Sequence, residues 1–427
     1  MANSVLGVVL LGSDFKALAV ARSLGRLGVP IGLVDNIPRS AWFSRHATKR
    51  FRWNQPMTGA AFAEFLLELA DWQSMRGWIL WPTQDETVEF VSRSWGRLSG
   101  AYRLITQPWE TLMWAVDKRR LHAAANAAEI LYPRTWYPDS EAELVRLELD
   151  YPVIVKPATS IDLQHAVGRK ALQAGDRVEL LDSYRTAARV IPADQITVQE
   201  VVPAQAQVSV AGFADQGRLL SAMTARRTRQ YPVDYGLGSS FVEAVELPGL
   251  IGVASRLVAR LELSGMTEVE FVVDSRDLQP RLLDVNPRPW GWHSLCIACG
   301  LDYPRIQYEH AMGRPAPDLA PRYGPRWIRL MTDVPAGIQG MRRGLYSPSS
   351  YLGSLLSWRL VGSVLDWRDP MPAAGDALVA ASRVLRARRF SASPSAPAAA
   401  KQPQDPLPPR PAVHAAGASS RPPPESG

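Results

Sequence analysis

The sequence predicts an α/β protein, and three observations carry that prediction. A β-branched strand at residues 5–11, a helix at 16–27 and a second strand at 30–34 follow one another as a β-α-β unit. Residues 78–83 indicate a further buried strand of the same unit. Two acidic strands within residues 267–291 are joined by a polar turn, the pattern of a hairpin. A parallel-sheet domain is therefore expected first, followed by lobes that mix helices with antiparallel strands.

The composition is that of a globular protein. With 427 residues and 46% hydrophobic content, the chain has enough apolar material for a large core and for about two or three domains. Every segment of membrane-spanning length contains a charge, and the opening residues 1–4 lack the basic flank of a signal peptide. These features predict a cytoplasmic protein without a membrane partner.

The net charge of +7 does not indicate nucleic-acid binding, because the basic residues are scattered and form no stripe with interleaved aromatics. The two cysteines, Cys296 and Cys299, have the spacing of a redox or metal pair. Without further cysteine or histidine ligands nearby, we interpret them as buried packing residues of a helix.

The most informative segment sets a carboxylate, an amide and a guanidinium at alternate positions, namely Asp284, Asn286 and Arg288. In an extended strand, such side chains share one face. The hairpin would bring Glu270 beside Asp284, so two carboxylates and one amide oxygen could hold Mg²⁺ next to a polyphosphate. The alternative is an edge strand whose polar face is simply solvated.

Three upstream segments stand in a fixed order before this one: residues 116–121 with the following 132–135, residues 151–157, and residues 198–203. Together the four motifs resemble the ATP-grasp superfamily, and in particular its ATP-dependent carboxylate-amine ligases. The resemblance covers residues 5–312. It implies an ATP-grasp fold preceded by a Rossmann-like domain, with ATP and Mg²⁺, or Mn²⁺, as cofactors.

The resemblance also implies a role for individual residues. Lys118 and Lys156 would reach the nucleotide phosphates. The hinge between the lobes, near 199–203, would contact adenine, and Gln207 or its neighbour Gln205 would contact the ribose. The implied nucleotide-binding residues are Lys118, Lys156, Gln199, Glu200, Val201, Val202 and Gln207. The implied metal ligands are Glu270, Asp284 and Asn286.

Two departures from glycine-rich patterns affect the prediction. Residues 158–165, after the second lysine, contain no glycine, although the superfamily usually has a glycine-rich phosphate loop there. The turn at residues 12–17 lacks the second and third glycines of a dinucleotide site, which argues against NAD. Asp85, in a polar turn after a strand, is either a substrate-side residue or a helix cap.

A basic segment at residues 226–232 lies between hinge and hairpin, and alternation would place Arg227 and Arg229 on one face. Similar segments in ligases of this superfamily place an arginine near the transferred phosphate. We therefore predict Arg288, Arg227 and Arg229 as catalytic residues, with a solvated basic loop as the alternative for the last two. His293 either touches substrate or caps a helix.

The predicted domains are 1–113, a Rossmann-like domain; 114–313, the ATP-grasp domain; 314–390, a helical region; and 391–427, a disordered tail rich in Pro and Ala. The aromatic residues of the helical region pack on the core or, alternatively, dock on a membrane surface or partner. The sequence is also compatible with a homodimer.

The predicted function is an ADP-forming ligase that joins a carboxylate to an amine or related nucleophile through an acyl phosphate. No protein nucleophile is needed, because the carboxylate substrate itself attacks phosphorus. Two alternatives use the same motifs. One is phosphorylation of bicarbonate, as in carbamoyl-phosphate synthases and carboxylases. The other is a nucleotide-binding scaffold with little turnover.

Overall fold

The first sheet of the computed structural model is the predicted parallel one, with strand order β3-β2-β1-β4-β5. The structure describes residues 5–158, 171–233, 238–317, 319–356 and 359–379. The strands of the first sheet are β1 (Val8–Leu11), β2 (Ile31–Asp35), β3 (Lys49–Arg52), β4 (Ile79–Pro82) and β5 (Arg103–Leu104). Its helices are α1 (Phe15–Gly25), the 3₁₀ helix η1 (Ser40–Phe43), α2 (Gly59–Trp72), α3 (Asp85–Arg93) and α4 (Trp95–Leu98).

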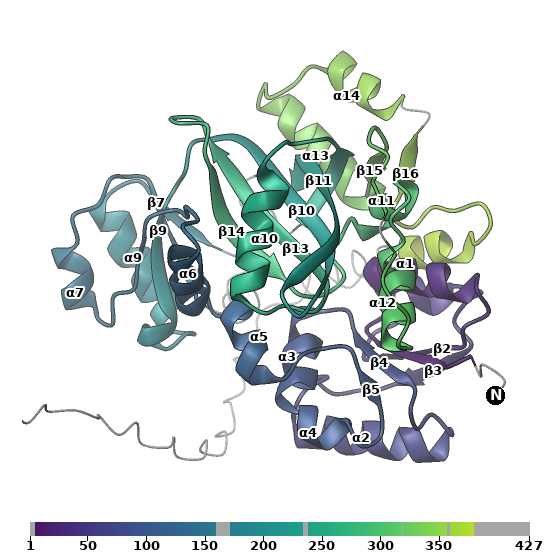
Figure 1. Cartoon of the computed structure of the whole chain (residues 1–427). Helices are drawn as coiled ribbons and strands as arrows, with labels where there is room; N and C mark the ends of the chain where they lie inside the picture. The colour runs from purple at the N-terminus through teal and green to yellow at the C-terminus, as the bar shows by residue number, and fades with distance from the viewer. Residues whose placement is uncertain (1–4, 159–170, 234–237, 318, 357–358, 380–427) are drawn as a thin grey trace, which may run out of the picture. The chain divides into compact units, whose positions relative to one another are not determined.

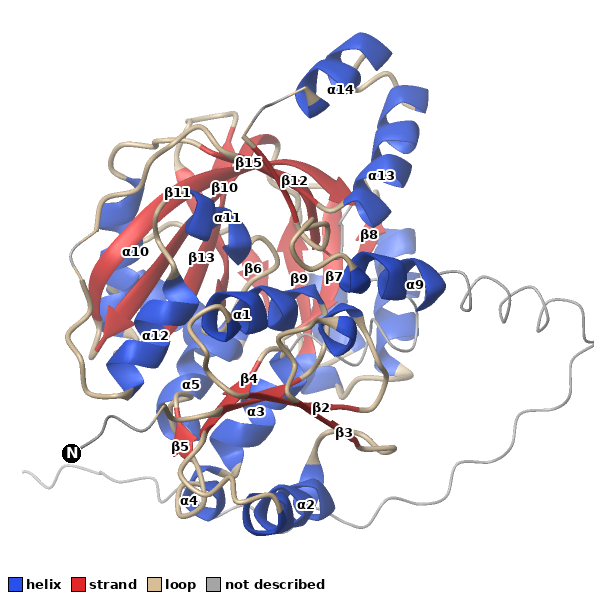
Figure 2. Ribbon diagram, turned by 90° about the vertical axis from the view of Figure 1, so that its right-hand side faces the viewer, coloured by secondary structure: helices blue, strands red, loops and turns tan. Residues whose placement is uncertain are grey.

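Alternation along β1 explains why both faces of this sheet are covered. Val8 and Leu10 pack in one hydrophobic cluster with α1, whereas Val9 and Leu11 pack in another with α2. Figure 2 shows α1 on one side of the sheet and α2 and α4 on the other. The predicted β-α-β unit and the α/β class are thereby confirmed.

The loops that follow β1 and β4 lie next to each other, because these strands are neighbours whose connections run in opposite directions. Gly12 has φ +109°, and a Cβ there would come within 2.6 Å of the Thr83 hydroxyl oxygen, so glycine is needed for this close approach. Asp14 then caps α1 by accepting the amide protons of Lys16 and Ala17 at 2.9 and 3.3 Å. In open parallel sheets, ligands bind at such a switch point.

The second sheet has four strands in the order β6-β9-β7-β8. They are β6 (Thr135–Trp136), β7 (Val153–Pro157), β8 (Leu172–Ala174) and β9 (Ile196–Glu200). The helices leading to it and covering it are α5 (Trp109–Val116), α6 (Lys118–Ala127), α7 (Glu141–Arg146), α9 (Arg177–Ala188) and the 3₁₀ helix η2 (Ala193–Gln195). Asp117 caps α6 at the amides of Arg119 and Arg120, which places Lys118 at the first helical position.

The third sheet has seven strands in the order β14-β13-β10-β11-β12-β15-β16 (Figure 1). They are β10 (Ala204–Asp215), β11 (Arg218–Tyr231), β12 (Gly238–Ala244), β13 (Gly265–Asp274), β14 (Pro280–Asn286), β15 (Arg326–Ile328) and β16 (Leu360–Gly362). The remaining helices are α10 (Leu250–Arg260), α11 (His293–Ala298), α12 (Tyr303–Ala311), α13 (Leu330–Arg342) and α14 (Pro348–Leu355).

The predicted hairpin and hinge both correspond to features of the structure. β13 and β14 pair antiparallel, with Glu270 opposite Asp284. The chain passes from the second sheet to the third between Glu200, the last residue of β9, and Ala204, the first of β10. The hinge predicted near residues 199–203 therefore coincides with the junction between two separate sheets.

The region after residue 313 requires a correction, because it is not only helical. β15 pairs with β12, and β16 pairs with β15, so this region extends the third sheet. Residues 1–380 group as one compact unit, and the predicted domain boundaries inside it stay predictions. The predicted tail, 391–427, lies outside the described residues, as does the glycine-poor loop at 159–165. Among the described residues, no helix is long and apolar enough to cross a membrane.

Arg229 connects the third sheet to α13 through a buried ion pair. Its Nε and Nη2 donate to the two oxygens of Asp333 at 2.8 and 2.9 Å, and Nη1 donates to Ser354. The side chains of Arg229 and Asp333 are 6% and 0% exposed. Arg229 thus contacts α13 and α14 rather than the acidic hairpin, and the structure does not support its predicted catalytic role.

This pair yields a stability prediction. Asp333→Ala would leave the Arg229 charge buried without its partner, so we expect unfolding free energy to fall by about 3–5 kcal/mol. The control is Asp366→Ala, which removes an ion pair to the more exposed Arg26 and is expected to cost at most about 1 kcal/mol. Denaturant unfolding of the full chain measures both values. Equal losses in the two variants would contradict the prediction.

Candidate active site

The three predicted metal ligands lie together on the β13–β14 hairpin. Glu270 is opposite Asp284 in the strand register, and Asn286 is opposite Glu268. The Asn286 side-chain nitrogen donates to Glu270 Oε1 at 2.8 Å and to Glu268 Oε2 at 3.1 Å. The pairing therefore gathers two carboxylates and an amide into one small volume, as the alternation predicted.

Each predicted metal ligand is also held by a cationic side chain. Lys118 forms an ion pair with Asp284, and Arg227 Nη2 lies 2.6 Å from Glu270 Oε2. Asn286 Oδ1 accepts a hydrogen bond from Arg288 at 3.0 Å. The oxygen atoms of the hairpin thus attract positive charge from three sides, which suits a hard divalent cation.

The donor set fits Mg²⁺ by its chemistry, since carboxylate and amide oxygens are the ligands that this ion prefers. Among the described residues, no group of three or more histidine, cysteine, aspartate or glutamate side chains is arranged to hold a metal. The predicted set contains only two carboxylates, so a bound phosphate would have to complete the coordination. This is the usual situation for Mg²⁺ in nucleotide sites.

Arg288 lies beyond the strand on which it was predicted. β14 ends at Asn286, and the Arg288 amide donates to the Asn286 carbonyl at 2.9 Å in a turn. The guanidinium still returns to the hairpin, and it also forms a two-pronged ion pair with Asp85, the first residue of α3. Arg288 therefore joins the acidic hairpin to the start of α3, at the switch point of the first sheet.

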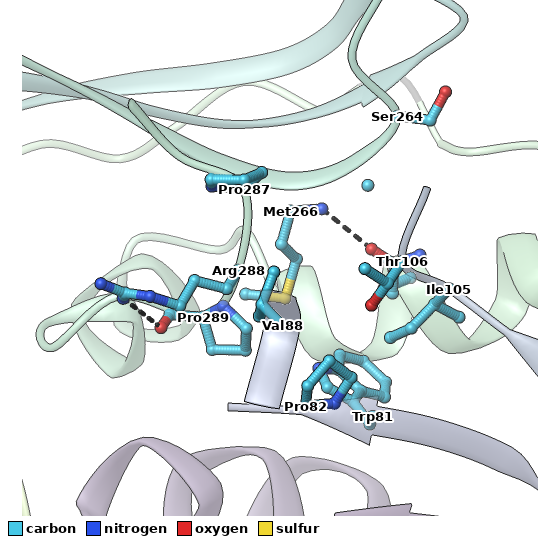
Figure 3. A pocket seen from close by; sticks show the side chains of 12 residues that line it. Trp81, Pro82, Val88, Ile105, Thr106, Ser264, Met266, Pro287, Arg288 and Pro289 are labelled. Atoms are coloured by element: carbon cyan, nitrogen blue, oxygen red, sulfur yellow. Dashed lines mark hydrogen bonds between the residues drawn. The ribbon is translucent and has the colours of Figure 1, made fainter. Parts of the chain in front are cut away.

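A small pocket that opens to solvent borders this arginine. It is lined from the first domain by Trp81, Val88 and Ile105, and from the hairpin side by Met266 and Arg288. Figure 3 shows the guanidinium of Arg288 pointing away from the apolar side chains. The apolar wall and the arginine thus lie on different sides of the same opening.

The two predicted phosphate-binding lysines lie on different elements of the region that contains the second sheet. Lys118 begins α6, and Lys156 lies on β7, where its Nζ donates to Gln199 Oε1 at 2.8 Å. Burial and the neighbouring Lys118 charge lower the pKa of Lys156 to about 7. His122, on α6, is close enough to both lysines to feel their charges, and burial and these charges lower its pKa to about 3.

The pKa of Lys156 leads to a pH prediction. Above about pH 7 this lysine is mostly neutral without a ligand, and a nearby phosphate would favour its charged form. ADP binding at about pH 8 should therefore take up as much as one proton, and affinity should fall as the pH rises towards 9. Calorimetry in two buffers of different ionisation enthalpy measures the uptake.

Lys156→Arg is the control for this experiment, because a guanidinium stays charged over the whole range and should abolish the uptake. A binding heat that does not depend on the buffer in the unaltered protein would contradict the prediction.

The predicted hinge residues differ in how far their polar groups are already hydrogen-bonded within the protein. The side chain of Gln199 is buried and engaged, since it accepts from Lys156 and its Nε2 donates to the Thr135 hydroxyl at 2.8 Å. The Val201 amide donates to the carbonyl of Pro152 at 3.3 Å. Within the described part of the chain, no backbone hydrogen bond engages the amide of Val202. The Val202 amide is therefore the best placed of these groups for contact with a base.

The side chains of Glu200 and Gln207 both contact arginine residues. The Glu200 carboxylate accepts the backbone amide of Arg134 at 2.9 Å and lies 3.4 Å from Arg276 Nη2. Gln207 Oε1 accepts from Arg227 Nη1 at 3.2 Å. Gln207 thus lies beside the arginine that pairs with Glu270, at the edge of the predicted phosphate region.

The structure also identifies residues that the sequence did not reveal. Glu268 is buried on β13, and burial and the Glu270 charge raise its pKa above the usual range. Lys16 follows the α1 cap, where burial lowers its pKa and it feels the charges of Arg288 and Asp85. A lysine two residues after a helix cap has no sequence signal of its own, whereas Glu268 shares the alternation of Glu270.

The remaining candidates are placed in the core. His293 is completely buried at the start of α11, with no hydrogen-bond partner for either ring nitrogen, and burial lowers its pKa to about 3. Cys296 and Cys299 are free and buried, and burial raises the pKa of both thiols. The interpretation of the cysteine pair as packing residues is confirmed.

Comparison with known proteins identifies the fold. An L-amino acid ligase from Bacillus licheniformis is 14% identical, with TM-score 0.56, covering 72% of this chain and 74% of that one. The ADP complex of purK, N5-carboxyaminoimidazole ribonucleotide synthetase, is 16% identical, with TM-score 0.61, covering 81% and 87%. The biotin carboxylase domain of Hydrogenobacter thermophilus 2-oxoglutarate carboxylase, solved with MgADP, ADP and bicarbonate, is 15% identical, with TM-score 0.62, covering 76% and 74%.

The chain therefore has the ATP-grasp fold, as the order of its four motifs predicted. Within that fold, residues 193–333 match the family model described as ATP-grasp in the biosynthetic pathway with Ter operon. The match begins before β9 and ends in α13, so it includes the hinge, the acidic hairpin and β15.

Proposed function

We propose that this protein is an ATP-dependent ligase that joins a carboxylate to an amine or related nucleophile through an acyl phosphate. The observation that carries the proposal is the meeting of Lys118, Arg227 and Arg288 around the oxygen ligands of one hairpin. Three cations and a metal site at one point suit the transfer of a phosphoryl group, whose charge grows on its equatorial oxygens. The similarity to an L-amino acid ligase supports the same chemistry.

The reaction proceeds in two displacements. A carboxylate oxygen of the acid attacks the γ-phosphorus of ATP, the bond to the bridging oxygen breaks, and ADP leaves. The amine nitrogen then attacks the acyl carbon, the acyl–oxygen bond breaks, inorganic phosphate leaves, and the nitrogen loses a proton. When bound, Mg²⁺, or Mn²⁺ in its place, supplies charge neutralisation at the β- and γ-phosphates.

The residues of this chain divide the remaining tasks. Glu270, Asp284 and Asn286 would hold the metal, and Lys118 and Lys156 would bind phosphate oxygens. Arg288 would stabilise the charge of the phosphoryl group during transfer, with Arg227 on its other side. The amide of Val202 and the carbonyl of Glu200 would contact adenine, and Gln207 the nucleotide sugar.

Metal and nucleotide are expected to bind together. In the structure Asp284 is paired with Lys118, and Glu270 with Arg227. A metal alone would have to separate both ion pairs. Phosphate groups offer the two cations new anionic partners, so the nucleotide makes the carboxylates available at little cost.

The test of the function is a coupled assay of ADP release with pools of amino acids, small carboxylates and amines. An acid labelled with ¹⁸O in its carboxylate should transfer one labelled oxygen to inorganic phosphate, because the acyl–oxygen bond breaks and the leaving phosphate carries the bridging oxygen. The omission of either substrate should reduce release to background.

Two other outcomes would favour different functions. ADP release that needs only bicarbonate would favour phosphorylation of bicarbonate, as in biotin carboxylases, whose fold this chain shares. Nucleotide binding without turnover on any pair would favour a nucleotide-binding scaffold.

A further inference from the structure

Glu268 is a buried carboxylate on the acidic hairpin itself, and the chemistry described so far does not use it. It lies on β13 two positions before Glu270, and it is 3% exposed, whereas the Glu270 side chain is 19% exposed. A buried carboxylate is costly unless hydrogen bonds satisfy both of its oxygens. Glu268 has such bonds: Oε1 accepts from the Trp292 indole nitrogen at 2.8 Å, and Oε2 accepts from the Asn286 side-chain nitrogen at 3.1 Å.

These contacts decide which way the amide of Asn286 points. Its nitrogen donates to one oxygen of Glu268 and one of Glu270, and its oxygen accepts from Nη2 of Arg288 at 3.0 Å. A flipped amide would place its oxygen against two acceptor oxygens, since the other oxygen of Glu268 accepts from Trp292, and its nitrogen against a guanidinium. An asparagine binds a hard metal only through its oxygen, so one orientation is useful and the other is not.

Of the two acceptors, only Glu268 stays available when the site is filled. Glu270 would then direct its oxygens to the metal, and its hold on the Asn286 nitrogen would weaken. Glu268 lies deeper in the sheet and is fixed from behind by Trp292, which is itself 2% exposed. The orientation of the ligand amide therefore depends on Glu268 most when the metal is bound.

We propose that Glu268 is a positioning residue that fixes the Asn286 amide with its oxygen towards the metal, and that Trp292 holds Glu268 in place. This inference rests on the proposed function, because it assumes that the hairpin binds a metal–nucleotide complex. Glu268 acts through Asn286 and does not touch the reacting atoms. Partners that orient metal ligands in this way typically change metal affinity by about 10–100-fold.

The main variant is Glu268→Gln. Glutamine keeps the size and can still accept from Trp292, but it then presents its NH₂ group to the Asn286 nitrogen, where two donors conflict. Mn²⁺ binding in the presence of ADP, followed by the resonance signal of free Mn²⁺, should weaken by about 10–100-fold. ADP binding in the presence of a chelator should stay within about twofold of the unaltered protein, because the residue has no phosphate contact.

Thr267→Val is the matched control. Thr267 is the neighbouring residue on the same strand, is 1% exposed, and its hydroxyl has no hydrogen-bond partner in the structure. Valine has the same shape, so Mn²⁺ binding should not change. Trp292→Phe should weaken Mn²⁺ binding in the same direction as Glu268→Gln, and it keeps the proposal testable if the glutamine variant does not fold.

A double variant gives a signature that a general loss of packing would not produce. Asn286→Asp in the Glu268→Gln background restores a donor–acceptor pair, since the glutamine NH₂ group can donate to the new carboxylate. Mn²⁺ binding should recover relative to Glu268→Gln alone. Asn286→Asp alone should unfold more easily in the absence of metal, because it places its new carboxylate beside Glu268 and Glu270.

Three results would overturn the proposal. One is Mn²⁺ affinity within about twofold of the unaltered protein in both Glu268→Gln and Trp292→Phe. Another is an equal loss of metal-free ADP binding, which would mean that Glu268 only supports the strand. The third is a failure of the double variant to recover. If the unaltered protein with ADP binds no Mn²⁺, the metal site of the proposed function fails as well, and this outcome is distinct from the other three.

Discussion

Arg288→Ala is expected to lower kcat by about 10²–10³-fold, or about 3–4 kcal/mol of transition-state stabilisation. The reason lies in what surrounds the guanidinium. In the structure it is balanced by Asp85 and donates to the side-chain oxygen of Asn286. Charge that develops on the transferring phosphoryl group would appear next to it, so its contribution should be largest in the transition state.

The diagnostic feature of this variant is the split between turnover and binding. MgATP affinity should change by no more than about threefold, because Lys118 and Lys156 would supply the ground-state phosphate contacts under the proposed function. Both quantities would be measured with the best substrate pair, by ADP formation and by calorimetry. Arg305→Ala, which removes an exposed arginine paired with Glu309 on α12, is the control and should leave both values unchanged.

Asp85→Asn complements this experiment from the other side of the ion pair. It removes the charge that balances Arg288 and keeps the arginine itself, so turnover should fall much less than in Arg288→Ala. Unchanged kcat in Arg288→Ala would refute the catalytic role of this residue. A matching loss of MgATP affinity would reduce it to a binding residue.

Asp284→Ala is expected to abolish the contribution of Mg²⁺ to ATP binding. In the unaltered protein, ATP should bind more tightly with Mg²⁺ than with a chelator, since the metal would connect phosphate oxygens to the two opposed carboxylates. The variant should bind ATP equally under both conditions, and its turnover should fall by about 10³-fold because the metal supplies several kcal/mol.

Asp277→Ala is the matched control for this variant. Asp277 lies in the turn of the same hairpin, is 43% exposed, and pairs with Arg281 at 2.9 Å. It should leave the Mg²⁺ effect intact. Equal ATP affinity with Mg²⁺ and with chelator in the unaltered protein would contradict the whole metal arrangement, whatever the variants do.

The local spacing of the hairpin could be predicted because a strand alternates its side chains with period two. That rule and the predicted hairpin place Glu270, Asp284 and Asn286 together, and the register of β13 and β14 agrees. It failed at Arg288, because β14 ends at Asn286 and the chain turns there. The Arg288 guanidinium still lies beside these residues, because it donates a hydrogen bond to the Asn286 side-chain oxygen.

Arg227 and Arg229 show where alternation is not enough. The pairing of β11 with β12 shifts between these two residues, so equal spacing in sequence does not give equal surroundings. Arg227 pairs with Glu270, but Arg229 pairs with Asp333, which is 104 positions away in the chain. No local pattern specifies that partner, since α13 is brought to the sheet by packing of the whole region.

The sequence by itself determined the α/β class, the order of the four motifs and the spacing of the proposed metal ligands, because each depends on periodicity or on short segments. Only the tertiary structure decided which charges meet. Lys118 reaches Asp284 across 166 positions, and Glu268 becomes a buried partner of Asn286 and Trp292. Such contacts depend on strand register and on the packing of distant elements, and burial then sets how strongly the charges interact.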